Sequence, residues 1–194
     1  MSETTLYLIR HAEPDASLKG RCYGTLDTGL SPTGREQAAH LSTRLADTNI
    51  AHIYASPRRR AVETAECLGR PVTIVPGFRE LDFGDFEGRP YDEIARTHPA
   101  LYQQWMDRPT EVQFPNGECF TQMQARVLEA HRALLARHEN QTVAVVAHGG
   151  AARIILADAL GLPAPNIFRL AQRYAALNLI RYYGQIPTVE LING

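Results

Sequence analysis

The stretch Leu6-Tyr7-Leu8-Ile9-Arg10-His11 joins a short apolar run to a basic pair, and it indicates the fold of the chain. Four successive apolar residues followed by a glycine-rich loop are typical of a buried strand. The strand then carries a guanidinium and an imidazole to its carboxyl end, the edge of an open α/β sheet at which ligands bind. An Arg-His pair arises by chance about once in a chain of this composition, so its weight depends on the rest of the sequence.

A second apolar run, residues 143–147, leads into His148-Gly149-Gly150 and brings a second histidine to the same kind of edge. Serine-proline pairs at 31–32 and 56–57 predict two helix starts, with serine as N-cap and proline in the first turn. The expected elements are strand 6–9, helix 31–47, strand 52–55, helix 56–69, strand 72–75, short helices 91–97 and 99–106, helix 120–138, strand 143–147, helix 150–160, and strands 175–182 and 188–192. This alternation predicts an α/β fold, a three-layer α/β/α sandwich with a mostly parallel central sheet.

Residues 76–118 interrupt the alternation and are rich in proline, glycine and aromatic side chains. We expect a single domain over residues 1–194, with a lid segment at about 76–118. A net charge of −1 gives no general attraction to nucleic acid or to anionic membranes. The first apolar run is too short for a signal peptide, and the three widely spaced cysteines form no zinc or disulfide pattern. We therefore expect a cytoplasmic protein with no metal, cofactor, nucleic-acid or membrane partner, and leave its oligomeric state open.

Two further motifs lie between the histidines, at residues 56–65 (SPRRRAVETA) and 79–88 (RELDFGDFEG). Together with Arg10-His11 and His148-Gly149-Gly150, in this order, they resemble the histidine phosphatase superfamily, which includes cofactor-dependent phosphoglycerate mutases. The resemblance extends from about residue 4 to about residue 150. It implies the family's α/β/α fold and metal-independent hydrolysis of phosphomonoesters through a phosphohistidine.

The resemblance implies that His11 is the nucleophile, because a neutral imidazole can attack phosphorus and split one displacement into two easier ones. It implies that Arg10, Arg60 and His148 bind the phosphoryl oxygens, and the planar fork of arginine suits that task. The family pattern Ser-x-x-x-Arg-Ala-x-x-Thr-Ala selects Arg60, while Arg58 is a competing candidate.

The resemblance further implies that Glu80 donates a proton to the leaving oxygen and then activates water. Asp82 is the reserve candidate for this role, and Asp85 and Glu87 are further carboxyls in the same segment. For Glu13 and Glu118 we expect structural roles, such as pairing with arginine or capping a loop.

Possible substrate contacts also follow from the resemblance: Ser17, Arg21, Tyr23, Gly24 and Gly149. The loop 20–27 aligns with the family's substrate-contacting loop, and Gly149-Gly150 would offer backbone amides at a helix N-terminus. Ser17 stands where relatives often have asparagine, which reaches further.

Within the superfamily, residues 20–24, 80–88 and 115–118 are most similar to the α-ribazole phosphatases of cobalamin nucleotide-loop assembly. The expected partner is therefore a small-molecule phosphate ester, such as α-ribazole 5′-phosphate. The many aromatic residues between 83 and 120 would either stack on a benzimidazole or form a small core within the insertion. The alternatives are a phosphoglycerate mutase, with more basic residues in its lid, and a non-catalytic phospho-ligand-binding relative, which would lack His11 or Glu80.

Overall fold

Strand β1 (Glu3–Arg10) lies inside the sheet of the computed structural model, which describes residues 2–194. Its side chains are buried on both faces. Leu6 and Leu8 pack into one hydrophobic core, and Ile9 packs into a second core across the sheet. A nearly continuous apolar sequence is typical of a strand that is covered on both sides.

The sheet has six strands in the order β3-β2-β4-β1-β5-β6. The other strands are β2 (His52–Ala55), β3 (Val72–Ile74), β4 (Thr142–Ala147), β5 (Leu177–Tyr183) and β6 (Ile186–Leu191). Strands β1 to β4 are parallel, whereas β5 and β6 are added as an antiparallel hairpin beside β1. The prediction of a mostly parallel sheet is confirmed. Because β1, β2 and β4 run the same way, the residues that follow them meet at one edge.

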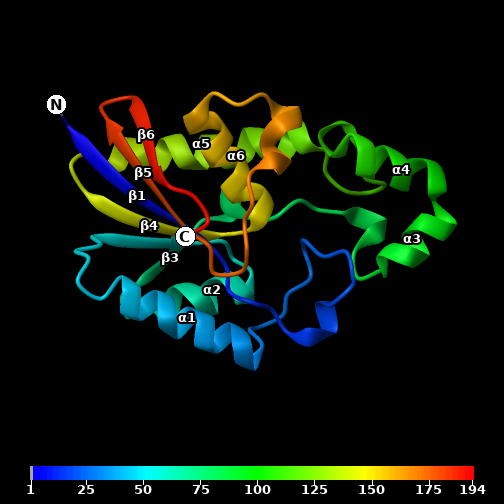
Figure 1. Ribbon diagram of the computed structural model, residues 1–194, viewed down its shortest axis with the longest axis horizontal. Helices are drawn as coiled ribbons and strands as arrows, with labels where there is room; N and C mark the ends of the chain where they lie inside the picture. Colours follow the sequence, from blue (N-terminus) through cyan, green and yellow to red (C-terminus); the bar gives the residue numbers. More distant parts are fainter. Residues whose placement is uncertain (1) are drawn as a thin grey trace.

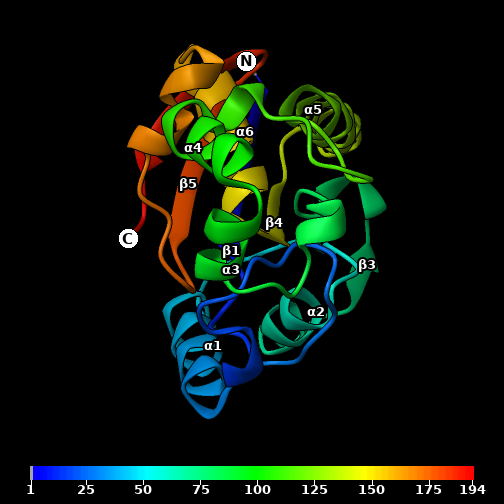
Figure 2. The ribbon, with the colours of Figure 1, turned by 90° about the vertical axis from the view of Figure 1, so that its right-hand side faces the viewer.

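Helices cover both faces of this sheet. Helices α1 (Pro32–Arg44) and α2 (Arg59–Glu66) lie on one face, and α5 (Phe120–Arg137) and α6 (Gly149–Leu160) lie on the other (Figures 1 and 2). Gly161 ends α6 in the left-handed conformation, where the lack of a Cβ matters. The three-layer α/β/α arrangement is therefore confirmed. None of the helices within the described residues is long and apolar enough to cross a membrane.

The two serine-proline pairs behave differently. The Ser31 hydroxyl accepts a hydrogen bond from the Gly34 amide at 2.9 Å and caps α1, as predicted. The prediction that Ser56 starts the second helix is wrong, because α2 begins at Arg59. The Ser56 hydroxyl is buried and lies 2.7 Å from Nε2 of His148, so it is engaged in a tertiary contact.

The insertion at 76–118 contains helices α3 (Tyr91–Thr97) and α4 (Pro99–Asp107), which lie at one end of the molecule (Figure 1). It contributes most of a third, small hydrophobic core, which includes Cys22 from outside the insertion and is linked through Leu81 to the core on one face of the sheet. That core consists of Cys22, Phe86, Ile94, Val112 and Phe114, with Leu81, Phe83, Leu101, Tyr102 and Trp105 packed against it. Most aromatic residues of the segment therefore take part in this packing.

Candidate active site

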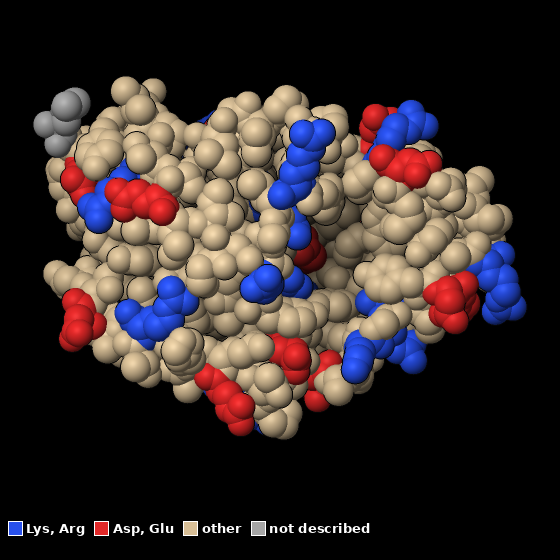
Figure 3. Space-filling view, in the orientation of Figure 1, with Lys and Arg blue, Asp and Glu red and all other residues tan. Residues whose placement is uncertain are grey.

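A cavity of about 230 Å³ lies between the sheet edge and the insertion. In Figure 3 a hollow separates the body of the molecule from the part that carries α3 and α4, with basic atoms at its edge and acidic atoms deep inside. The cavity lining includes all five residues for which the sequence predicts catalysis or phosphate binding: Arg10, His11, Arg60, Glu80 and His148. They come from segments far apart in the chain, and the sheet edge brings them together.

His11 is buried directly after β1, and a backbone carbonyl orients its ring. Its Nδ1 lies 2.7 Å from the carbonyl oxygen of Ala12, so the neutral ring donates from Nδ1 and keeps a lone pair on Nε2. Burial, followed by the charges of Arg60 and Arg10, holds the pKa of His11 well below its usual value. His11 is therefore held as the neutral, nucleophilic imidazole.

His148 is the N-cap residue of α6 and lies beside His11, with 5.1 Å between the ring centres. Its Nδ1 accepts from the Arg60 guanidinium at 3.3 Å, so in the neutral ring Nε2 carries the proton and donates to Ser56 at 2.7 Å. Burial and the charge of Arg60 lower the pKa of His148 as well. Sequence reasoning missed Ser56, although it opens the pattern that selected Arg60.

Arg60 and Arg10 are anchored by backbone carbonyls. Arg60 is fully buried and donates to the carbonyls of Leu26 at 2.6 Å and Gly24 at 2.9 Å. Arg10 donates to the carbonyl of Gln172 at 2.6 Å. The Nε atoms of both arginines are buried without a hydrogen-bond partner among the described residues. A buried charged donor without a partner is costly, so both side chains suit an anionic ligand.

Two tyrosines support these arginines. The Arg10 guanidinium lies 4.3 Å from the ring centre of Tyr174, and that of Arg60 lies 5.2 Å from the ring centre of Tyr23. The two hydroxyls are 2.8 Å apart, and burial raises the pKa of Tyr23. Such cation–π contacts stabilise a desolvated guanidinium. No motif pointed to Tyr174, because it lies in the connection before β5, far from the motifs.

The geometry favours Arg60 over Arg58 and Glu80 over Asp82. Neither Arg58 nor Asp82 lines the cavity. The Asp82 carboxylate instead accepts from the Gly84 amide at 2.9 Å and fixes a local turn.

Glu80 is tied to the start of α6. One carboxylate oxygen accepts from the Gly150 amide and the other from the Leu81 amide, both at 3.0 Å. The Gly150 amide is thus engaged by Glu80, and the expected amide for a phosphoryl oxygen is left to Gly149. A Cβ atom at Gly150 would lie 2.3 Å from the carboxylate oxygen Oε1 of Glu80, which is possible only if the carboxylate moves.

Gly150→Ala should therefore displace Glu80 and impair proton transfer. We expect kcat/KM for an alkyl phosphate to fall by about 10²-fold, the typical cost of misplacing a catalytic group by about 1 Å. Hydrolysis of p-nitrophenyl phosphate should fall much less, because p-nitrophenolate leaves with little help from an acid. Steady-state kinetics with both substrates measures the difference. An equal loss for both would mean that the substitution disturbs phosphate binding instead.

The cavity carries an excess of positive charge. Three arginines line it, namely Arg10, Arg60 and Arg153, against the single carboxylate of Glu80, which leaves two positive charges while both histidines are neutral. A phosphomonoester carries close to two negative charges at pH 7. Sequence reasoning missed Arg153, which lies on α6 four residues after Gly149 and hence on the same helical face. Its Nε donates to the carbonyl of Leu170 at 2.9 Å.

Three predicted substrate contacts are not brought to the cavity, and one of them, Gly24, is buried with its carbonyl accepting from Arg60. Ser17 is exposed in a short 3₁₀ helix, where its backbone amide donates to Asp15 at 2.9 Å. Arg21 is exposed and donates to the carbonyl of Gly88 at 2.7 Å. Neither residue lines the cavity, whereas Tyr23 and Gly149 do. The Ser17 amide is used in its own turn, and Arg21 reaches across to the insertion, contacts that alignment of the loop does not reveal.

The structural roles expected for Glu13 and Glu118 agree with their contacts. Glu118 pairs with Arg126 at 2.7 Å, and Glu13 accepts from the Ser31 hydroxyl at 2.7 Å. Both therefore stabilise segments around the site without lining the cavity.

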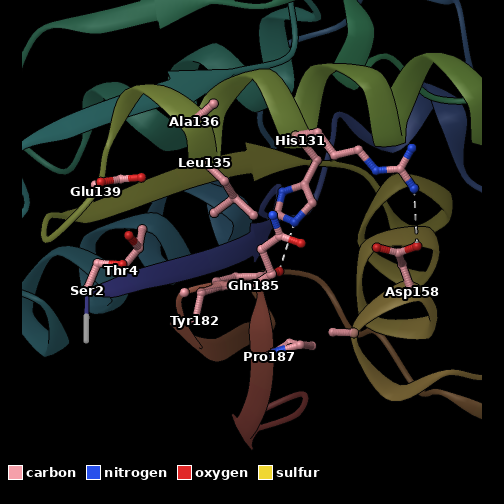
Figure 4. Close-up of a pocket in the computed structure, with 13 residues that line it drawn as sticks. Ser2, Thr4, His131, Leu135, Ala136, Glu139, Asp158, Tyr182, Gln185 and Pro187 are labelled. Carbon is pink, nitrogen blue, oxygen red and sulfur yellow. Dashed lines mark hydrogen bonds and ion pairs between the residues drawn. The ribbon is translucent and has the colours of Figure 1, made fainter.

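A larger cavity of about 750 Å³ lies at the amino-terminal end of β1 (Figure 4). His131 of α5 donates to or accepts from Tyr182 of β5 at 2.8 Å, and Arg132 pairs with Asp158 at 3.8 Å across it. None of the predicted catalytic residues lines this cavity. Over residues 2–194, no three His, Cys, Asp or Glu side chains are grouped closely enough to hold a metal ion.

Comparison with known proteins agrees with this geometry. The sequence model of the "Histidine phosphatase superfamily (branch 1)" matches residues 6–194. Phosphoserine phosphatase 1 of Hydrogenobacter thermophilus is 34% identical over 161 residues, 81% of this chain and 76% of that protein. A probable phosphoglycerate mutase of Erwinia tasmaniensis is 31% identical, over 90% of this chain and 83% of its own. The crystal structure of the α-ribazole phosphatase from Shigella flexneri is similar with a TM-score of 0.88 and 28% identity, covering 98% of this chain and 96% of that one.

Proposed function

Since the chain belongs to the histidine phosphatase superfamily, we propose that it is a phosphomonoester hydrolase that forms a phosphohistidine at His11. The names of its relatives support a phosphatase or mutase activity. The observation that carries the proposal is the cavity itself. It holds a neutral buried imidazole with a free Nε2, two arginines with unpaired Nε donors and the Glu80 carboxyl.

In the proposed reaction, Nε2 of His11 attacks phosphorus while the bond to the ester oxygen breaks. Arg10 and Arg60 neutralise the charge on the equatorial oxygens, which is the main catalytic task in phosphoryl transfer, and the Nε2–H group of neutral His148 donates to one of these oxygens in place of Ser56. Glu80 donates a proton to the departing alcohol. A water molecule then attacks phosphohistidine, gives its proton to Glu80 and releases phosphate, so each half-reaction leaves Glu80 in the state that the other requires.

Hydrolysis of p-nitrophenyl phosphate should persist in EDTA, because arginine and histidine side chains supply the positive charge and hydrogen bonds around phosphorus. Vanadate should inhibit it, since vanadate mimics pentacoordinate phosphorus. Initial rates with and without each reagent test both statements. Inactivation by EDTA that magnesium reverses would contradict the proposal.

Two substrate classes have support. The similarity to the Shigella flexneri α-ribazole phosphatase supports α-ribazole 5′-phosphate or a similar ester, and the cavity walls include Phe83 and Trp105, on which an aromatic group can stack. The similarity to phosphoserine phosphatase 1 supports a small phosphorylated acid. For that class, the Arg153 guanidinium in the cavity offers a partner for a second anionic group. Turnover of α-ribazole 5′-phosphate, O-phosphoserine and its decarboxylated counterpart O-phosphoethanolamine distinguishes the two.

A phosphoglycerate mutase has less support from the insertion. Its arginines do not line the cavity. Arg89 pairs with Glu93 at 2.9 Å and Arg108 with Glu111 at 3.1 Å, so these cations are used within the insertion. The cavity also retains both His11 and Glu80, which supports an enzyme over a non-catalytic binding protein.

A further inference from the structure

The Glu87 carboxylate, in the insertion, binds the backbone of a distant loop. It accepts hydrogen bonds from the amides of three successive residues and from one amide of its own segment. These are the amides of Gly24 at 3.0 Å to each oxygen, Thr25 at 2.9 Å, Leu26 at 3.4 Å and Phe83 at 3.1 Å. Glu87 does not line the cavity, and no ion pair to it is found within residues 2–194. Backbone amides alone thus satisfy its charge.

The other side of the same loop holds Arg60. The carbonyls of Gly24 and Leu26 accept from its two terminal nitrogens at 2.9 and 2.6 Å. Successive amides that converge on an anion form a backbone nest, and charge-assisted bonds make it rigid. Residues 24–26 therefore connect the Glu87 carboxylate on their amide side to the Arg60 guanidinium on their carbonyl side.

The loop also has little room to move toward the insertion. A Cβ at Gly24 would lie 1.8 Å from the carbonyl oxygen of Leu81 and 3.1 Å from Glu87. Glycine allows this close approach, which brings the three amides within reach of the carboxylate. Phe83, whose amide binds the same carboxylate, itself lines the cavity.

We propose that Glu87 is a positioning residue of the phosphate site: by fixing residues 24–26 it sets the place of Arg60, and through the Phe83 amide it ties that place to the insertion. This inference rests on the proposed function, because Arg60 matters as a ligand of the phosphoryl group. Glu87 thereby anchors two walls of the cavity at once, one that contacts phosphate and one that contacts the rest of the substrate.

Substitutions at Glu87 separate charge from length. Glu87→Gln replaces an acceptor oxygen by an NH₂ group, which donates and so opposes amides that also donate. Glu87→Asp keeps both acceptor oxygens but is one methylene shorter. Asp85→Asn is the matched control, because Asp85 is an exposed acid two residues away that accepts from the Asn116 side chain.

The test is a double-mutant cycle with Arg60→Ala, measured as kcat/KM for p-nitrophenyl phosphate and as vanadate affinity from the fluorescence of Trp105, the single tryptophan, which lines the cavity. In the otherwise unchanged protein, Glu87→Gln should lower both quantities by about 10- to 100-fold, and Glu87→Asp by less. Combined with Arg60→Ala, the additional loss should be below about threefold, because coupled residues are not additive. Asp85→Asn should change neither quantity.

A loss of the same factor with and without Arg60 would overturn the proposal, since Glu87 would then act independently of Arg60. An unchanged Glu87→Gln protein would overturn it as well. Circular dichroism reports whether each variant is folded, and Glu87→Asp replaces Glu87→Gln in the cycle if the latter does not fold. If the unsubstituted protein hydrolyses no phosphomonoester, the proposed function fails, while vanadate affinity still decides the role of Glu87.

Discussion

His11→Ala should abolish the phosphoenzyme and lower turnover by a factor on the order of 10⁴ or more, the loss typical of removing a covalent nucleophile. The reason is geometric. The Ala12 carbonyl takes the proton on Nδ1 of His11, and Nε2 is left with its lone pair in the cavity. Rapid quenching with ³²P-labelled substrate, without acid, should show label on unsubstituted protein that resists alkali and is lost in acid.

The protonation state of His11 can be measured directly. Burial and two arginines lower its pKa, and a lowered pKa means that the neutral form persists to a lower pH than in an exposed histidine. In a ¹H–¹⁵N NMR titration, the free protein should keep the neutral tautomer with the proton on Nδ1 when the pH falls through 6.5. A titration midpoint near 6.5 would contradict the structure.

For the labelling experiment with His11→Ala, His131→Gln is the matched control. His131 is also a buried histidine, and its pKa is lowered to about 4, yet it lies at the other cavity. This variant should retain the label. If label persists in His11→Ala, the nucleophile is another residue, and His148 is the first to examine because its ring lies beside that of His11.

Glu80→Gln should slow phosphorylation of the enzyme by an alkyl phosphate far more than by p-nitrophenyl phosphate. An alkoxide needs a proton to leave, and proton transfer by a positioned side chain is typically worth about 10² to 10⁴ in rate. The Gly150 and Leu81 amides each donate to one carboxylate oxygen, so the carboxamide of the variant fills the position and keeps one of these two hydrogen bonds while it removes the proton. Glu80 should also assist the second half-reaction, so single-turnover formation of phosphohistidine is the quantity to measure.

Asp82→Asn is the control for that experiment, since Asp82 lies two residues away and does not line the cavity. Any slowing that Asp82→Asn causes should be the same for the alkyl phosphate and for p-nitrophenyl phosphate. Equal slowing of both substrates by Glu80→Gln would reject Glu80 as the acid. A selective defect in Asp82→Asn would move the role there.

Local sequence patterns predicted the strands and helices that build the sheet, because the cores on its two faces require a periodic arrangement of apolar residues. They also predicted the residues at the ends of β1 and β4, since chain direction alone places Arg10, His11 and His148 at one edge. Ser56 shows where this reasoning fails. A serine before proline has the local features of a helix cap, yet its hydroxyl binds His148, ninety-two residues away.

Most of the other residues whose roles differ from the prediction also depend on contacts between segments that are far apart in the sequence. Tyr174 and Arg153 reach the arginine cluster or the cavity through the packing of segments that no short motif contains. Glu87 was considered as an acid because of its type, whereas its neighbours are amides brought from residues 24–26. Ser17 and Arg21 were assigned by alignment, whereas the Ser17 amide binds Asp15 in its own turn and Arg21 binds the carbonyl of the distant Gly88.

The small core of the insertion has a consequence for how unfolding is observed. Phe86, Ile94 and Phe114 pack with one another and not with the cores on the sheet, and Trp105 packs on this small cluster. Regions with few buried contacts open at lower free energy than the rest of a protein. Trp105 emission measured in urea therefore reports the unfolding of this small core, while far-ultraviolet circular dichroism reports the unfolding of the sheet and its helices. The two unfolding midpoints differ if the small core opens first.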